Sequence, residues 1–182
     1  LFFKGKYSSN ELILILTKIM ASTLRLEDLT QKTLHQLLTT ARIERGSFII
    51  FQKNAASSVI HEGYSHEPAY DKETISRLAA LRKIVLYDEE EDESFKDLMR
   101  KHDCLVVLPL FDRESGEGVL LLGEKKSGEI YSQQDVKLLQ IFGPEISVAI
   151  RNAKSYDEIS KFNITLREEV DRATKDLKVA NE

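Results

Sequence analysis

The sequence predicts an α+β fold, with an antiparallel sheet of five or six strands, helices on both of its faces and a long helix at each end. Two short polar turns, at 54–58 and 112–117, each separate two runs of apolar and β-branched residues. Tight turns of this kind join antiparallel neighbours. The segment from Ser132 to Glu182 is interrupted only by Gly143 and Pro144, which predicts one helix far longer than a single domain can cover.

The N-terminal elements follow from periodicity and end signals. Ser9 and Asn10 precede an apolar stretch, which predicts a linker or signalling helix within residues 1–20. Its apolar residues exceed what one face needs, so we expect it to pack on both a domain and a partner chain. A second amphipathic helix is predicted at 26–42, ahead of Gly46.

The remaining elements alternate between strands and short helices. Strands are predicted at 104–110 and 117–125. The runs 104–110 and 118–123 are apolar on both faces, so both faces of the sheet should be covered. We expect helices 26–42 and 132–153 on one face and the two shorter helices on the other. The other predicted elements are strands 47–52, 58–64 and 83–87, and helices 71–82 and 95–101.

Composition excludes several classes of protein. The net charge is −4 and Lys and Arg are interleaved with acids, which argues against nucleic-acid binding. Cys104 is the only cysteine, so the chain can form no internal disulfide and no cysteine-based zinc site, as is typical of a reducing compartment. The early apolar run Leu12–Leu16 is too short to span a bilayer, and no signal peptide is visible. We therefore expect a cytoplasmic location with no membrane segment in this sequence. The opening residues, LFFKGKYSS, fit either the trailing edge of a preceding inner-membrane anchor or a linker.

The acidic run 88–94 has two interpretations. It is a solvated loop that also caps the next helix, because anionic side chains favour helix N-termini. The alternative is a calcium site, but the run lacks the alternating, Gly-punctuated oxygen pattern of a calcium loop.

The segment GVLLLGEKKSGEIYSQQDVKLLQIFGPEISVAIRNA, at 118–153, resembles the GAF family of sensory domains. A hydrophobic strand closes at Gly123, a charged hairpin containing Gly128 follows, and Tyr131-Ser132 leads into a helix. Ser132 is a good N-cap and Asp135 stands where its carboxylate reaches back to the cap. The resemblance covers roughly residues 20–155 and implies a GAF domain at 21–154, without indicating its ligand.

The segment FNITLREEVDRATKDLKVANE, at 162–182, resembles the linker that enters the dimerisation domain of sensor histidine kinases. The periodicity of residues 155–182 predicts a coiled coil. Such a seam indicates a parallel homodimer that leads to an output domain, although a surface helix with incidental periodicity would show the same spacing. The predicted seam has Ile159, Leu166, Ala173 and Ala180 at d positions, and Tyr156, Asn163, Val170 and Leu177 at a positions.

If the fold is that of the GAF family, seven residues come from segments that cover the second face of the sheet. They either line a ligand pocket or fill a core. An aromatic cavity with few polar groups would take a small apolar or aromatic ligand and not a phosphate. The residues are Phe51, Tyr64, Tyr70, Ile75, Phe95, Leu98 and Met99.

No catalytic constellation and no metal-ligand pair at helical spacing is present in the sequence. His102 and Cys104 could in principle bind a haem or a metal ion. A single His and a single Cys beside a strand are, however, usually structural. The Asp-Ile-Pro segment of bilin-binding relatives is missing. The five marker positions of the cyclic-nucleotide signature are occupied in this chain by Glu124-Lys125, Tyr131 and Asp135-Val136. Three of these five residues differ from the signature. The cofactor is therefore unknown, with bilin, haem and cyclic nucleotide all disfavoured.

These observations together predict a non-catalytic sensory module of a two-component signalling protein, which relays a ligand or conformational signal through a dimeric helix. Two alternatives remain. One is a dimerisation spacer without a ligand. The other is a small redox enzyme, because some GAF-like domains reduce methionine sulfoxide with cysteines. The single cysteine argues against it, since no resolving thiol is present.

Overall fold

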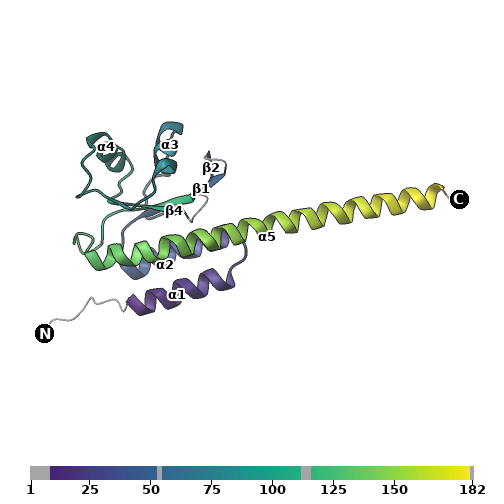
Figure 1. The fold of residues 1–182 in the computed structure, drawn as a ribbon, viewed down its shortest axis with the longest axis horizontal. Helices are drawn as coiled ribbons and strands as arrows, with labels where there is room; N and C mark the ends of the chain where they lie inside the picture. Colours follow the sequence, from purple (N-terminus) through teal and green to yellow (C-terminus); the bar gives the residue numbers. More distant parts are fainter. Residues whose placement is uncertain (1–8, 53–54, 112–115, 181–182) are drawn as a thin grey trace.

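The computed structural model describes residues 9–52, 55–111 and 116–180, and within them it has a five-stranded antiparallel sheet with helices on both faces (Figure 1). The strand order is β2-β1-β5-β4-β3. The predicted fold class is thereby confirmed. In chain order the elements are α1 (Ser9–Ser22), α2 (Leu26–Ala41), β1 (Gly46–Gln52), β2 (Ala55–Glu62), α3 (Lys72–Ala80), β3 (Val85–Leu86), α4 (Glu93–Lys101), β4 (Val106–Phe111), β5 (Gly116–Leu122) and α5 (Gln133–Ala180).

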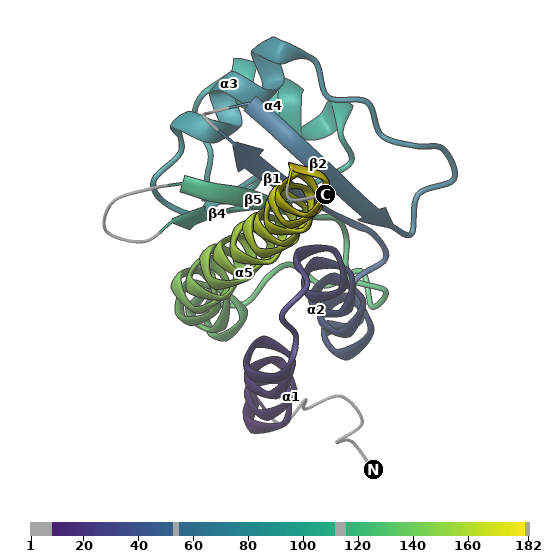
Figure 2. The ribbon, with the colours of Figure 1, turned by 90° about the vertical axis from the view of Figure 1, so that its right-hand side faces the viewer.

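The sheet separates two apolar cores. Figure 2 shows α2 and α5 beneath the sheet, α1 below them, and α3 and α4 above it. Strand β1 supplies both cores because successive side chains point to opposite faces. Phe48 and Ile50 pack with α2 and α5, whereas Ile49 and Phe51 pack with α3 and α4. The predicted distribution of helices over the two faces is correct.

The strand boundaries differ from the prediction at the edge of the sheet. β3 has two residues instead of the predicted five, because it lies at the edge and pairs only with β4. β2 begins at Ala55, three residues before the predicted start. Both predicted hairpins are present as antiparallel pairs, β1 with β2 and β4 with β5. Residues 53–54 and 112–115 of their turns lie outside the described residues.

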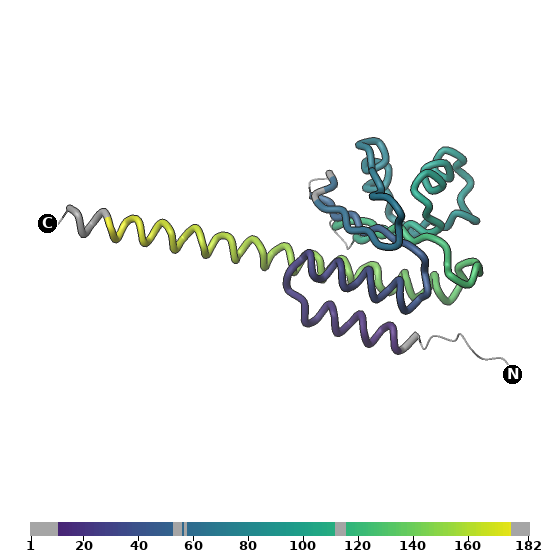
Figure 3. Tube along the Cα trace, turned by 180° about the vertical axis from the view of Figure 1, so that it is seen from behind, coloured from purple at the N-terminus to yellow at the C-terminus, as the bar shows by residue number. Residues whose placement is uncertain are grey.

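Helix α5 belongs to the domain over its first half and leaves it over its second half (Figures 1 and 3). It begins with the predicted capping box, in which the Ser132 amide donates to Asp135 Oδ2 at 2.6 Å and the Asp135 amide donates to Ser132 Oγ at 3.2 Å. The helix continues through Pro144, whose ring lies on the exposed side. Beyond the buried Ala153, no side chain described as far as Lys175 is buried.

Helix α1 packs on the outer side of α2, with Leu12 and Leu16 buried. Leu14, on its other side, is 71% exposed, so this helix keeps an apolar side chain turned away from the domain. Among the described residues no helix is both long and apolar enough to cross a membrane.

Candidate functional site

Most of the predicted pocket residues lie deep in the core between the sheet and the two short helices. Phe51, Ile75, Phe95, Leu98 and Met99 are all at most 6% exposed and pack together. Tyr70 is partly buried against the same cluster. Tyr64 differs from them because it lines a hollow with a volume of about 390 Å³ at one end of the sheet.

This hollow lies where β1 begins and where the segment 63–69 passes between β2 and α3. Its other walls are Arg45 and the residues 101–103 that follow α4. Ser47 is two residues before Ile49 on β1, so it shares the α3/α4 face, and it pairs with His61 on β2. We call this group of polar side chains the polar end of the sheet; its members are Arg45, Ser47, His61, Tyr64, Tyr70 and His102.

The aromatic rings of the polar end are stacked on one another. Tyr70 and His102 lie with ring centroids 4.6 Å apart and an interplanar angle of 27°. His61 and Tyr64 meet edge to face at 6.3 Å. The Tyr64 hydroxyl donates a long hydrogen bond of 3.4 Å to the His102 carbonyl. The rings therefore hold the segment 63–70 against the end of α4.

Five polar atoms of this group are buried without a hydrogen-bond partner: Arg45 Nε, Ser47 Oγ, His61 Nδ1, Tyr70 Oη and His102 Nε2. Each such atom costs about 1–3 kcal/mol when it is left unsatisfied. Only two other side chains of the described residues, Thr33 and Ser147, have such an atom. Unsatisfied groups are therefore concentrated at the polar end.

Burial controls the protonation of these groups. It lowers the pKa of His102, with the positive charge of Lys101 acting in the same direction, so the imidazole is held neutral. Burial also raises the pKa of Tyr64 and of Tyr70. The Ser47 hydroxyl, which approaches both phenols without the geometry of a normal hydrogen bond, acts in the opposite direction. The Cys104 thiol, beneath the same end, has its pKa raised to about 12 by burial, with the charge of Asp103 adding to the effect.

The charged residues around the hollow form ion pairs that are exposed to solvent. Arg45 contacts Glu44 at 2.9 Å and Asp103 at 3.5 Å, and Lys101 contacts Asp71 at 2.9 Å. The Lys101 ammonium and the Thr74 amide hold the pKa of Asp71 below its usual range. Such pairs are worth at most about 1 kcal/mol each, so a ligand can displace them at small cost.

A short chain of contacts connects the polar end to the start of α5. The Gly123 amide donates to the Arg45 carbonyl at 2.9 Å, and the Tyr131 hydroxyl donates to the Gly123 carbonyl at 2.6 Å. Lys125 pairs with Asp135, the carboxylate of the capping box. Burial raises the pKa of Asp135, but hydrogen bonds from Lys125 and Ser132 outweigh it and keep the pKa low. Arg45 is thus two hydrogen bonds away from the residue that precedes the helix cap.

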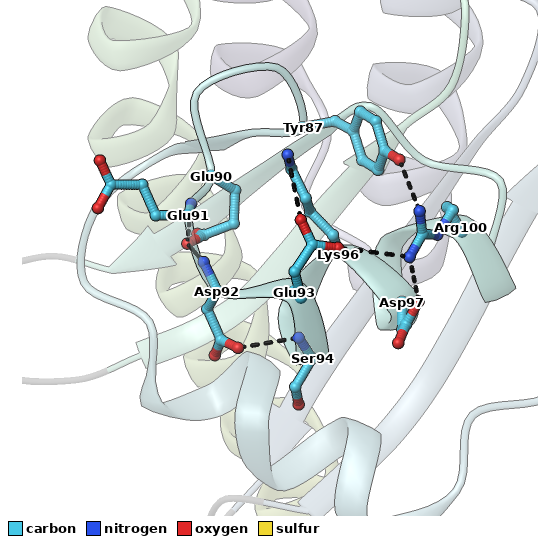
Figure 4. A network of polar contacts seen from close by, with 9 residues as sticks. All are labelled: Tyr87, Glu90, Glu91, Asp92, Glu93, Ser94, Lys96, Asp97 and Arg100. Carbon is cyan, nitrogen blue, oxygen red and sulfur yellow. Dashed lines mark hydrogen bonds and ion pairs between the residues drawn. The ribbon is translucent and has the colours of Figure 1, made fainter.

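The acidic run leads into α4 and caps it, as one of its two interpretations predicted (Figure 4). Asp92 accepts from the Ser94 amide at 2.9 Å, and Glu90 accepts from the Glu91 and Asp92 amides at 2.9 Å. Lys96 and Arg100 provide the cationic partners. Among the described residues no group of three His, Cys, Asp or Glu side chains is placed to hold a metal ion.

The exposed part of α5 presents a stripe of apolar side chains, with the exposed Ile164 lying outside it. Four predicted seam residues have large exposed fractions: Tyr156 47%, Ile159 60%, Leu166 46% and Val170 56%. Asn163 and Ala173 are also exposed, whereas the side chains of Leu177 and Ala180 lie outside the described residues.

The same stripe extends back into the domain. Ile141, Val148 and Phe162 fall on one seven-residue spacing and are 57%, 37% and 67% exposed. The upstream continuation of the predicted a positions, Phe142 and Ala149, is buried in the domain. Near the domain the exposed stripe therefore consists of Ile141 and Val148. The sequence did not predict this part of the stripe, because Phe162, which has the same spacing, is not at an a or d position of the predicted seam.

Comparison with solved structures identifies the architecture. The phycoerythrobilin-bound GAF domain from a cyanobacterial phytochrome has a TM-score of 0.61 and 15% identity, covering 82% of this chain and 98% of that chain. The chain has the fold of a GAF domain. No family model and no curated protein matches its sequence.

Other GAF-fold neighbours differ in what they do. One is the GAF domain of a protein described as a sensor histidine kinase from Pseudomonas syringae pv. tomato, with TM-score 0.58, 13% identity and coverage of 85% and 92% of the two chains. Another is fRMsr of Staphylococcus aureus, solved in complex with substrate, with TM-score 0.59, 11% identity and coverage of 82% and 99%. At these identities the likeness shows the GAF fold and does not assign a role.

Proposed function

We propose that this GAF-fold chain is a non-catalytic sensory module of a signal-transduction protein and acts as a parallel homodimer whose C-terminal helices carry the signal. A sensor histidine kinase is the favoured setting, supported by the helix pattern and by the P. syringae neighbour. The observation that carries the proposal concerns the single helix α5. Its first half packs in the core beneath the sheet, and its second half extends away from the domain with an exposed apolar stripe. An exposed apolar stripe of this kind marks a surface for interaction with another chain.

Ultracentrifugation of matched variants tests the dimer. Ile159 and Ile164 lie on the same exposed part of α5 with similar exposed fractions of 60% and 57%, but they are about 140° apart around the helix, so Ile164 lies outside the predicted seam. Ile159→Lys should convert the dimer to a monomer, whereas Ile164→Lys should leave it intact. A wild-type chain that sediments as a monomer at every accessible concentration would remove the proposal.

The enzymatic alternative has little support from the chemistry of Cys104. A thiol reacts as the thiolate, and burial holds this thiol protonated at physiological pH. A reductase mechanism also needs a second thiol, and the sequence has none. We therefore propose that the module does not reduce methionine sulfoxide, which an assay with a thiol reductant checks.

Three further expectations belong to the proposal. We propose no covalently attached bilin, because the only cysteine is buried, and an absorption spectrum after incubation with biliverdin tests this. The cytoplasmic location rests on cysteine usage alone. The apolar ligand expected from the sequence stays a prediction, but the polar lining of the hollow favours a polar one.

A further inference from the structure

The unsatisfied atoms of the polar end share one chemical property. The Arg45 Nε–H can only donate a hydrogen bond, the hydroxyls of Ser47 and Tyr70 can donate, and each unpartnered ring nitrogen of His61 and His102 donates in one tautomer. No carboxylate, carboxamide or other acceptor-only oxygen is among the buried, unpartnered side-chain atoms of the residues described. All five atoms of the polar end can therefore donate to a ligand, and the Arg45 Nε–H can do nothing else.

The lining of the hollow is charged and leaves room for a ligand. Arg45 and Lys101 line it together with the carboxylates Glu67 and Asp103. The present partners of the two cations are solvent-exposed carboxylates, namely Glu44, Asp103 and Asp71. The volume of about 390 Å³ lies within the range of small-molecule sites. Tyr64 and His102 form part of the wall and offer aromatic surface to the rest of a ligand.

We propose that the polar end binds a small organic carboxylate, whose oxygens accept from Arg45 Nε and from the buried hydroxyls and replace Asp103 beside the guanidinium. The inference rests on the proposed sensory function and specifies its ligand class. In the present structure these donor atoms are closed off, so the segment Gly63–Tyr70 moves outward when the ligand enters. That segment is anchored mainly by ring contacts and the single long hydrogen bond of Tyr64.

Ser47 and Asp103 give variants whose effects separate a ligand site from a structural cluster. Ser47→Ala removes a buried, unpartnered hydroxyl, so it should raise the melting temperature of the free protein and weaken carboxylate binding. A purely structural hydroxyl would give the opposite change in stability. Asp103→Asn removes the competing carboxylate and should tighten binding, whereas Asp97→Asn, on the exposed side of α4, should not.

The experiment is a thermal-shift and calorimetric titration of the whole chain with acetate, succinate, citrate and phenylacetate at millimolar concentrations, each beside its neutral amide. We expect at least one carboxylate to raise the melting temperature while its amide does not, by mass action on the folded state. Arg45→Lys, which keeps the charge but loses the Nε–H, should weaken that binding about ten-fold or more, equivalent to about 1.4 kcal/mol. Arg82→Lys, at an exposed site away from the hollow, is the control.

Three outcomes would overturn the inference. They are no shift with any of the carboxylates, equal shifts with acids and amides, and unchanged affinity in both Arg45→Lys and Ser47→Ala. Ultracentrifugation of the same preparations reports separately on the proposed function. A dimer that binds no carboxylate refutes the ligand class alone, and a monomer refutes the relay.

Discussion

The ion pair between Lys154 and Glu117 should hold α5 to the sheet at the point where the helix leaves the domain. Lys154 Nζ donates to Glu117 Oε2 at 2.6 Å and to the Phe51 carbonyl at 2.8 Å. The side chain of Glu117 is only 8% exposed and that of Lys154 is 25% exposed. Removing one partner of a buried pair costs about 3–5 kcal/mol because the other charge stays buried.

The expected cost of Lys154→Met is smaller than that range. Lys154 is a quarter exposed, and Glu117 has a further interaction that remains. We therefore expect a loss of about 2 kcal/mol in the free energy of unfolding, which corresponds to a melting temperature about 4–8 °C lower for a chain of this size. Replacing both partners by apolar residues is often nearly neutral, so the double variant Lys154→Met/Glu117→Leu should lose less than the sum of the single variants.

Urea denaturation of the wild type, both single variants and the double variant measures this coupling. Lys161→Met is the control, because Lys161 lies on the exposed part of the same helix. A coupling energy below about 0.5 kcal/mol would show that the pair does not hold the helix in place.

Four further predictions follow from the structure. Gly118→Ala should destabilise the fold by at least about 2 kcal/mol in urea melts, because its Cβ would lie 2.3 Å from the Ile49 carbonyl oxygen, whereas Gly116→Ala, whose Cβ meets nothing within 4 Å, should not. The pKa of His102 is lower in the folded state than in the unfolded state, so the unfolded chain binds more protons as the pH falls below about 6.5. The free energy of unfolding should therefore fall between about pH 7 and pH 5. The His102→Gln variant should show a weaker dependence on pH in this range. Asn163→Val should raise the thermal stability of the proposed dimer and loosen its choice of oligomer in ultracentrifugation, because an Asn at the predicted a position would fix register at a cost in stability. In the full-length protein, deleting the seven residues Glu168–Thr174 turns the downstream seam by a net offset of only about 20° and should preserve regulated output. Deleting the four residues Glu168–Asp171 turns it by about 40° to the other side and should lock output on or off.

The sequence predicted the sheet well because its strands carry local signals. Apolar runs divided by polar turns specify hairpins, and the pairings of β1 with β2 and of β4 with β5 agree with them. The length of β3 was not predictable in this way. The segment KIVLY is uniformly β-favourable, and only its position at the sheet edge, with β4 as its one neighbour, limits it to two residues.

The polar end was harder to predict, because its residues come from four separate segments. Tyr64 and Tyr70 were singled out as aromatic residues near the second face, but the same argument selected Phe95 and Met99, which fill the core. Residue type cannot separate a pocket wall from a core, since the distinction depends on packing. A local signal did exist at Ser47, a polar residue whose strand position points into an apolar core.

The domain holds α5 both where the helix begins and where it leaves the domain. These two attachments determine which movements of α5 can be transmitted to its exposed part. At its start, the capping box is linked through Tyr131 and Gly123 to Arg45 at the polar end. At its exit, Lys154 is bound to Glu117 and Phe51. A helix is stiff, so a displacement at the cap cannot be absorbed between these two points without breaking backbone hydrogen bonds. Differential binding of about 1–3 kcal/mol at the polar end is enough to bias two arrangements of such a helix. If the exposed stripe packs against a second copy of the helix, as proposed, the two arrangements present different faces to that helix. The orientation of the stripe is then the quantity that an output domain would detect.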